Sequence, residues 1–175
     1  MRLRKGFTLV ELLVVITIIV LLLALLSVLI KGVVEKARNT KTHALILLLD
    51  KGCSKYKTEL GVYPPMTGFS DSSCLHFYLG RELQIPTGRD KDGNVTGYKK
   101  LPPVIQFKAD MLSLPPGQDN LDPSKGAVPV MDAWAKVVRY MPYPGKNNTT
   151  GVDIWSLGKE DADAMDDITN WGKEF

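Results

Sequence analysis

Five carboxylates crowd together near the end of this 175-residue chain, at Glu160, Asp161, Asp163, Asp166 and Asp167. In a plain surface loop, carboxylates this close repel one another. A hard cation such as calcium relieves that repulsion, because it takes roughly six to eight oxygen ligands from carboxylates and backbone carbonyls and tolerates irregular loops. The run therefore predicts either a solvated acidic loop or a cation site.

Glu11 is a carboxylate in a different setting, because it stands inside the apolar run of residues 7–30. As a helix this run is about 36 Å long, enough to cross a bilayer core of about 30 Å. A secretory signal peptide has a shorter apolar region of about 7–15 residues, so the run predicts a retained membrane span. A carboxylate in hydrocarbon costs about 2.5–3.5 kcal/mol, so Glu11 either sits at headgroup depth or has a partner.

Side chains suited to catalysis are sparse. His43 and His76 have no nucleophile motif beside them, and Ser156 lacks the Gly-x-Ser-x-Gly elbow. Cys53 and Cys74 lack the spacing of metal ligands. The sequence therefore predicts that the protein is not an enzyme. An even cysteine count beyond the span permits a Cys53–Cys74 disulfide, with two buried thiols as the alternative.

The charge distribution bears on partners and orientation. The net charge is +3, and Arg2, Arg4 and Lys5 account for all of it, because the rest of the chain has 19 basic and 19 acidic side chains. Nucleic acid is therefore not an expected partner. The basic residues before the span favour a cytoplasmic N-terminus.

A long helix must position most of these groups. All eleven prolines follow Tyr63, so the helix of the span can continue to about Leu60 and should stop at GVYPP, because Pro64 and Pro65 cannot continue it. Its second half has an amphipathic pattern that should pack against something. The apolar positions expected to form that stripe are Val33, Ala37, Ala44, Leu45, Leu48, Tyr56 and Leu60.

The rest of the chain predicts short elements. Residues 72–84 (SSCLHFYLGRELQ) could hold a short helix and residues 104–107 (VIQF) a strand, while the Asp-Gly pair in DKDGNVTG predicts a turn rather than half of a calcium loop. Residues 135–143 and 151–158 are rich in β-branched and aromatic residues and predict a hairpin. Packed on the long helix, two or three strands would make an α+β fold with a small antiparallel sheet.

The start of the chain resembles the type IV pilin and pseudopilin family. The resemblance is carried by Lys5-Gly6-Phe7-Thr8-Leu9-Val10-Glu11 followed directly by an apolar helix. It implies that a prepilin peptidase cuts between Gly6 and Phe7 and methylates the new amino terminus of Phe7. It also implies that Glu11 pairs with the N-terminal amine of a neighbouring subunit, which offsets part of the cost of burying both charges.

Later stretches are similar to the major pseudopilin of type II secretion, namely KYKTELGVYPP, Asp132-Ala133-Trp134, DIWSLG and DDITNW. The resemblance implies a pilin-like fold and a subunit that polymerises with other pseudopilins on an inner-membrane secretion platform, with its C-terminal domain in the periplasm. The alternatives are a type IV pilus subunit for adhesion, motility or DNA uptake, and a membrane-anchored extracytoplasmic binding protein that does not polymerise. The expected segments are a leader (1–6), a transmembrane helix half (7–30), an amphipathic helix half (31–62), a loop-rich region (63–131), and a C-terminal hairpin with the acidic loop (132–175).

The resemblance also bears on the acidic run, because the corresponding loop of the major pseudopilins binds calcium. Asp166 and Asp167 match the family's ligand positions, and Glu160 stands where an aspartate is usual. The ligand role could shift from Glu160 to the adjacent Asp161, and backbone carbonyls near Leu157 would complete the shell. The resemblance therefore implies a structural calcium ion that holds the C-terminal segment on the hairpin.

Overall fold

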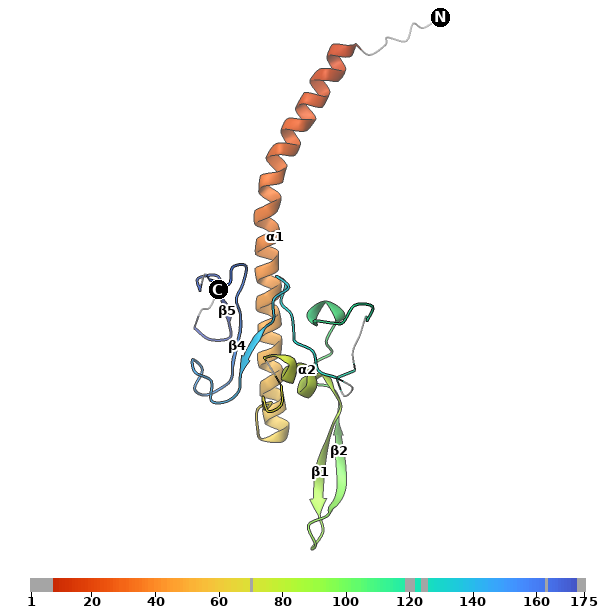
Figure 1. Ribbon diagram of the computed structural model, residues 1–175, viewed down its shortest axis with the longest axis vertical. Helices are drawn as coiled ribbons and strands as arrows, with labels where there is room; N and C mark the ends of the chain where they lie inside the picture. Colours follow the sequence, from red (N-terminus) through yellow and green to blue (C-terminus); the bar gives the residue numbers. More distant parts are fainter. Residues whose placement is uncertain (1–7, 70, 119–121, 124–125, 163, 173–175) are drawn as a thin grey trace, which may run out of the picture. The chain divides into compact units, whose positions relative to one another are not determined.

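The computed structural model describes residues 8–69, 71–118, 122–123, 126–162 and 164–172 (Figure 1). The chain divides into two compact units, residues 1–38 and residues 39–175, and each is described by itself. Helix α1 (Leu9–Leu60) is continuous and contributes to both units. Its extent agrees with the sequence prediction of one helix that ends at about Leu60.

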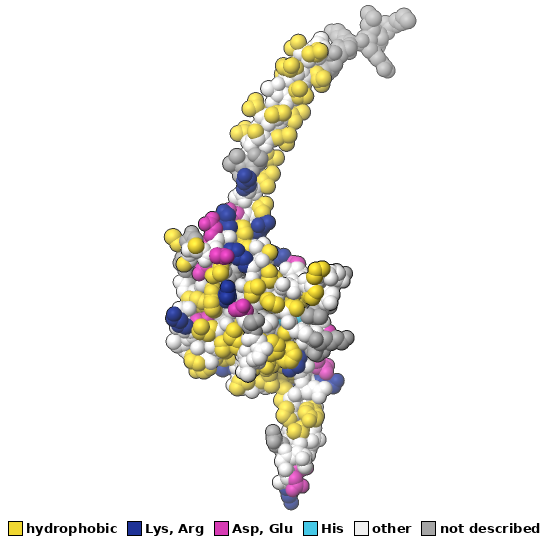
Figure 2. Space-filling model, in the orientation of Figure 1, with side chains coloured by type: hydrophobic (Ala, Val, Ile, Leu, Met, Phe, Trp, Pro, Cys, Tyr) yellow, Lys and Arg dark blue, Asp and Glu magenta, His cyan; other side chains and the backbone are white. Residues whose placement is uncertain are grey.

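The described part of the first unit is the N-terminal portion of α1. Its large apolar side chains are exposed, from 43% at Val15 to 79% at Leu9, and Figure 2 shows hydrophobic side chains covering this part of the helix. By length and composition α1 is able to cross a membrane. A helix that exposes apolar side chains all round is suited to hydrocarbon rather than to water. The unit is consistent with a single-pass membrane anchor.

In the second unit, the C-terminal part of α1 forms one wall of the hydrophobic core. Leu45, Ile46, Leu49, Cys53 and Tyr56 are all buried there. The stripe expected from the sequence was right at Leu45 and Tyr56, and Leu60 is partly buried against the core. It was wrong at four positions that are exposed, namely Val33, Ala37, Ala44 and Leu48. Residues 44–49 are apolar throughout, so their hydrophobicity alone could not choose between neighbouring faces.

The end of α1 is set by Gly61, which has a φ of +78° and whose N–H donates to the Lys57 carbonyl oxygen at 2.7 Å. A glycine in the left-handed region is a common helix terminator because it has no Cβ to clash. The two prolines that follow cannot continue the helix. Tyr140 then ties this exit to the sheet, because its hydroxyl donates to the Pro64 carbonyl oxygen at 2.7 Å.

The middle of the chain contains a short helix and a projecting hairpin. Helix α2 (Ser73–Gly80) confirms the predicted helix, whereas the predicted strand at residues 104–107 is wrong. That segment pairs with none of the described strands, and it is held instead by the Ile105 N–H, which donates to the Leu79 carbonyl oxygen at 2.9 Å, and by the Ile105 side chain, which is buried in the core. A 3-10 turn, η1 (Ala109–Met111), follows it.

Strands β1 (Leu83–Arg89) and β2 (Val95–Leu101) form an antiparallel pair by themselves. The predicted turn joins them. Asp90 Oδ1 accepts hydrogen bonds from the N–H groups of Asp92, at 3.0 Å, and Asn94, at 2.8 Å. This turn was predicted from the sequence but the two strands were not, because Pro86, Gly88 and Gly97 weaken the strand pattern.

The C-terminal sheet has the order β3–β4–β5 and is antiparallel throughout. Its strands are β3 (Arg139–Met141), β4 (Asp153–Ser156) and β5 (Ile168–Thr169). The β3–β4 hairpin confirms the prediction, and the two-residue strand β5 was not foreseen. Val138, Tyr140, Val152 and Ile154 are buried in the core cluster that also contains Leu49 of α1. The α+β fold with a long N-terminal helix and small antiparallel sheets is thus confirmed.

Candidate functional site

The first candidate site is the start of α1, where Thr8 and Glu11 form a reciprocal pair. The Thr8 N–H and hydroxyl both donate to Glu11 Oε2 at 2.8 Å, and the Glu11 N–H donates to Thr8 Oγ1 at 3.2 Å. This is a capping box, which satisfies N–H groups that have no partner inside the helix. The sequence analysis missed it, although the Thr-x-x-Glu spacing before an apolar run is its usual signal.

The capping box fixes where the Glu11 carboxylate points. Both Thr8 donors bind the same oxygen, Oε2, so the carboxylate is turned back toward the N-terminal end of α1. The positive end of the helix dipole also favours a negative charge there. Gly6 and Phe7, between which cleavage is predicted, lie outside the described residues. The described geometry presents a carboxylate close to the point where a processed chain would begin.

The second candidate site is the acidic loop between β4 and β5. Asp166 closes it, because its Oδ2 accepts hydrogen bonds from the N–H groups of Lys159, at 2.7 Å, and Glu160, at 2.8 Å. Gly158 makes this closure sterically feasible: its φ is +59°, and a Cβ there would meet the Asp166 carbonyl oxygen. The other carboxylate oxygen, Asp166 Oδ1, is buried and has no hydrogen-bond partner among the residues that the structure describes.

A lysine from outside the loop reaches into it. The Lys136 ammonium is 2.5 Å from Asp161 Oδ1 and donates to the Lys159 carbonyl oxygen at 2.9 Å. The Lys136 side chain is 25% exposed, whereas the Asp161 side chain is 75% exposed. A cation already stands among the loop's oxygens, supplied by the chain itself.

The Asp132 carboxylate binds both the turn that contains Lys136 and the end of β4, where the acidic loop begins. Its Oδ1 accepts hydrogen bonds from the N–H groups of Trp134 and Lys136, each at 2.8 Å, and its Oδ2 accepts one from the Ser156 hydroxyl. Ser156 Oγ in turn accepts the Gly158 N–H at 3.0 Å. A buried carboxylate that accepts several hydrogen bonds is well satisfied. Sequence reasoning noted Asp132 only within a resemblance, because its partners are distant in the chain.

The described residues do not assemble a calcium cage. They contain no group of three or more His, Cys, Asp or Glu side chains placed to hold a metal ion. Of the expected ligands, Glu160 and Asp161 are exposed, while Leu157, Asp166 and Asp167 are partly buried. Asp163 lies outside the described residues. The loop nevertheless has one feature of a cation site, the buried Asp166 Oδ1 that lacks a donor.

The cysteines lie in the core and not in a reactive site. Cys53 of α1 and Cys74 of α2 are fully buried free thiols, and the Cys74 thiol donates to the Asp71 carbonyl oxygen at 3.2 Å. Burial raises the pKa of Cys74 to about 12 and raises that of Cys53 well above its ordinary value. Thiols that stay protonated are poor nucleophiles. The Cys53–Cys74 disulfide stays a prediction.

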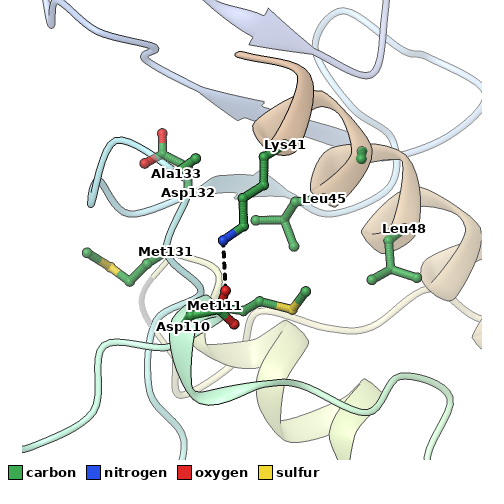
Figure 3. A pocket seen from close by; sticks show the side chains of 9 residues that line it. Lys41, Leu45, Leu48, Asp110, Met111, Met131, Asp132 and Ala133 are labelled. Atoms are coloured by element: carbon green, nitrogen blue, oxygen red, sulfur yellow. Dashed lines mark hydrogen bonds and ion pairs between the residues drawn. The ribbon is translucent and has the colours of Figure 1, made fainter. Parts of the chain in front are cut away.

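An apolar groove lies beside α1 in the second unit (Figure 3). Its volume is ≈ 180 Å³, and Leu45 and Leu48 of α1 line it together with Met111 and Met131. Three charged residues also line it, and two of them are paired, with Lys41 Nζ 2.7 Å from Asp110 Oδ2. Figure 3 shows this contact between α1 and η1, together with the third charged residue, Asp132.

Comparison with known families identifies the motif at the start of the chain. Residues 1–27 match the family model of the prokaryotic N-terminal methylation motif. The chain carries a prepilin leader. This leader indicates a type IV pilin-like subunit that is processed by a prepilin peptidase and associates with a membrane. The comparison with curated proteins gives no match, and neither does the comparison with solved structures.

The leader gives the geometry at the start of α1 a chemical meaning. Cleavage after Gly6 would create a cationic amine at Phe7, one residue before the capping threonine. Because Thr8 occupies Oε2 of Glu11, the second carboxylate oxygen, Oε1, is the one left for a further cation.

Proposed function

We propose that this protein is a pseudopilin, a structural subunit that polymerises into a type II secretion pseudopilus after its leader is removed. The observation that supports this most strongly is the continuity of α1, which runs from directly after the leader into the core of the second unit. One element thus serves as membrane anchor and as scaffold of the folded domain. A filament subunit that leaves the membrane needs such a continuous connection to its domain.

Assembly in this proposal depends on Glu11. In the membrane, an unpaired carboxylate is unfavourable, and a neighbouring subunit's N-terminal amine offsets that penalty. The pairing is specific because only a neighbour at the correct axial offset brings its amine to the carboxylate. The capping box supports this role, since it holds the carboxylate in one orientation before a neighbour arrives.

Two features favour a secretion subunit over a type IV pilus subunit. True pilins more often end in a loop closed by cysteines, and this chain has no cysteine after Cys74. The segments DIWSLG and DDITNW, which resemble the major pseudopilin, form β4, β5 and the loop between them. The alternative function, a type IV pilus subunit, shares the leader and the long helix.

A structural calcium ion in the acidic loop is a further part of the proposal. Its support is the buried Asp166 Oδ1 without a donor, which a cation would satisfy. Asp167 and backbone carbonyls near Leu157 would share in holding the ion with Asp166, and Glu160 or Asp161 would add a carboxylate. By binding oxygens near the start and the end of the loop, the ion would link β4 to β5. It would stabilise the folded state by mass action.

The test is to delete the gene in its native host and compare the secreted proteins with motility, adhesion and DNA uptake. A pseudopilin predicts that folded proteins accumulate in the periplasm while motility, adhesion and DNA uptake continue. A matched control restores the gene with Glu11 replaced by alanine, which should fail to rescue secretion. Normal secretion together with lost motility, adhesion or DNA uptake would show a pilus subunit instead.

A further inference from the structure

The Lys136 ammonium contacts two oxygens of the acidic loop. Its two ligands are the Asp161 carboxylate, at 2.5 Å, and the Lys159 carbonyl oxygen, at 2.9 Å. Carboxylate and backbone carbonyl oxygens are also the ligands that calcium takes. An ammonium has three N–H donors and binds such oxygens as a point charge.

The contact is more than an exposed ion pair. Exposed pairs contribute little, because solvent screens them and two long side chains must be ordered. Here only the Asp161 side is largely exposed, and Lys136 adds a hydrogen bond to the main chain of the loop. The contact therefore fixes the course of the loop backbone as well as pairing two charges.

The same buried carboxylate aligns both partners of the contact. Asp132 holds the Lys136 N–H directly, and it holds Ser156, whose hydroxyl accepts the Gly158 N–H. Gly158 directly precedes Lys159, whose carbonyl receives the ammonium. One hydrogen-bond network thus fixes the backbone of both Lys136 and the loop, so the ammonium is already positioned to bind the Lys159 carbonyl oxygen.

We propose that Lys136 is the resident cation of the acidic loop, closing it without a metal ion and competing with calcium for the Asp161 carboxylate. The first half of the proposal stands on the contacts alone, and the second half rests on the calcium proposed above. A calcium ion that takes Asp161 as a ligand would have to displace the ammonium from it. Removing the ammonium should therefore lower the stability of the metal-free protein and raise its affinity for calcium.

The experiment uses the full chain in detergent, with Lys136→Met and, as the matched control, Lys91→Met. Lys91 is an exposed lysine in the turn between β1 and β2, which form a different sheet from the one that flanks the acidic loop, so its replacement makes the same charge change elsewhere. Melting is followed by tryptophan fluorescence, since Trp155 and Trp171 are in edge contact with ring centroids 5.7 Å apart beside the loop. Each protein is melted in chelator and in a series of calcium chloride concentrations.

In chelator, Lys136→Met should melt about 2–4 °C lower than wild type, and Lys91→Met should not differ from it. The calcium concentration that gives half of the maximal shift should fall about tenfold in Lys136→Met, equivalent to about 1.4 kcal/mol. Asp161→Asn removes the other partner of the ion pair at a side chain that is largely exposed, and it should also lower the melting temperature in chelator. This variant covers the case in which Lys136→Met does not fold.

Three results would overturn the proposal. If Lys136→Met and Asp161→Asn melt like wild type in chelator, Lys136 does not close the loop. If Lys136→Met melts lower in chelator but reaches its half-maximal shift at the same calcium concentration as wild type, Lys136 does not compete with calcium. If no protein melts higher in calcium, the loop does not bind calcium and there is nothing for Lys136 to compete with. None of these results depends on leader processing or secretion, so failure here is distinguishable from failure of the proposed function.

Discussion

Asn170 ties the C-terminal strand to both the sheet and α1, so Asn170→Ala should destabilise the second unit strongly. Its side-chain N–H groups donate to Asp50 Oδ1 at 2.7 Å and to the Val152 carbonyl oxygen at 2.9 Å. Its Oδ1 accepts the Ile154 N–H at 2.9 Å. One side chain thus joins three segments of the chain, and alanine removes all three bonds.

The magnitude follows from the kinds of bond that are lost. A neutral hydrogen bond contributes about 0.5–1.5 kcal/mol net and one to a charged group about 1.5–3 kcal/mol. Two of the bonds of Asn170 are neutral and one reaches the Asp50 carboxylate. Because Ile154 and Val152 are buried, their main-chain groups would lose partners that water cannot replace. The expected loss is about 3–4 kcal/mol, or roughly 10 °C in melting temperature.

The assay is thermal melting of the full chain in detergent, followed by tryptophan fluorescence. Asn94→Ala is the control, because its exposed side chain makes a hydrogen bond to Asp90 Oδ2 at 3.2 Å in the β1–β2 turn. A change at such a surface site is usually within about 0.5 kcal/mol. If Asn170→Ala melts within a degree or two of the Asn94→Ala protein, the hydrogen bonds of Asn170 do not hold the C-terminal segment as described.

Four further predictions concern other parts of the chain. Glu11→Ala should be inserted and cleaved normally but should enter filaments poorly, and an unchanged filament yield would reduce Glu11 to a helix cap. Gly158→Ala should cost about 2–3 kcal/mol more than Gly172→Ala, because both glycines have positive φ but only at Gly158 would the Cβ meet Asp166; equal melting temperatures would contradict this. Burial lowers the pKa of His76, so its contribution to the free energy of unfolding should be full above about pH 6.5 and should be lost at lower pH. His76→Gln should remove that part of the pH dependence, and an unaltered pH profile would contradict this. Finally, protein denatured without reductant should take up no thiol reagent if the predicted disulfide forms, and labelling of both cysteines would refute it.

The long helix was predictable because its signals are local. The apolar run, the lack of proline before Pro64 and the glycine at position 61 all act over a few residues, and the structure places the end at Leu60. The buried face of α1 was less predictable. Residues 44–49 are all apolar, so which of them are buried depends on how the sheet and α2 pack against the helix, and the helix sequence alone cannot predict it.

The site was predictable where it depends on short motifs and was missed where it depends on distant contacts. Spacing pointed to the leader and to Glu11, and the same spacing contained the capping box that was overlooked. The acidic loop could be located from its composition. Its cation could not, because Lys136 is 25 residues from Asp161 along the chain and reaches it only through the turn that Asp132 organises.

The central claim is that the chain is a prepilin-type subunit, and mass spectrometry of the membrane-extracted protein tests it most directly. The account predicts a mature chain that begins at an N-methylated Phe7, and a Gly6→Leu variant that remains uncut. A chain that retains Met1 through Gly6 in cells with an active prepilin peptidase, or one cut beyond Ile30, would contradict it.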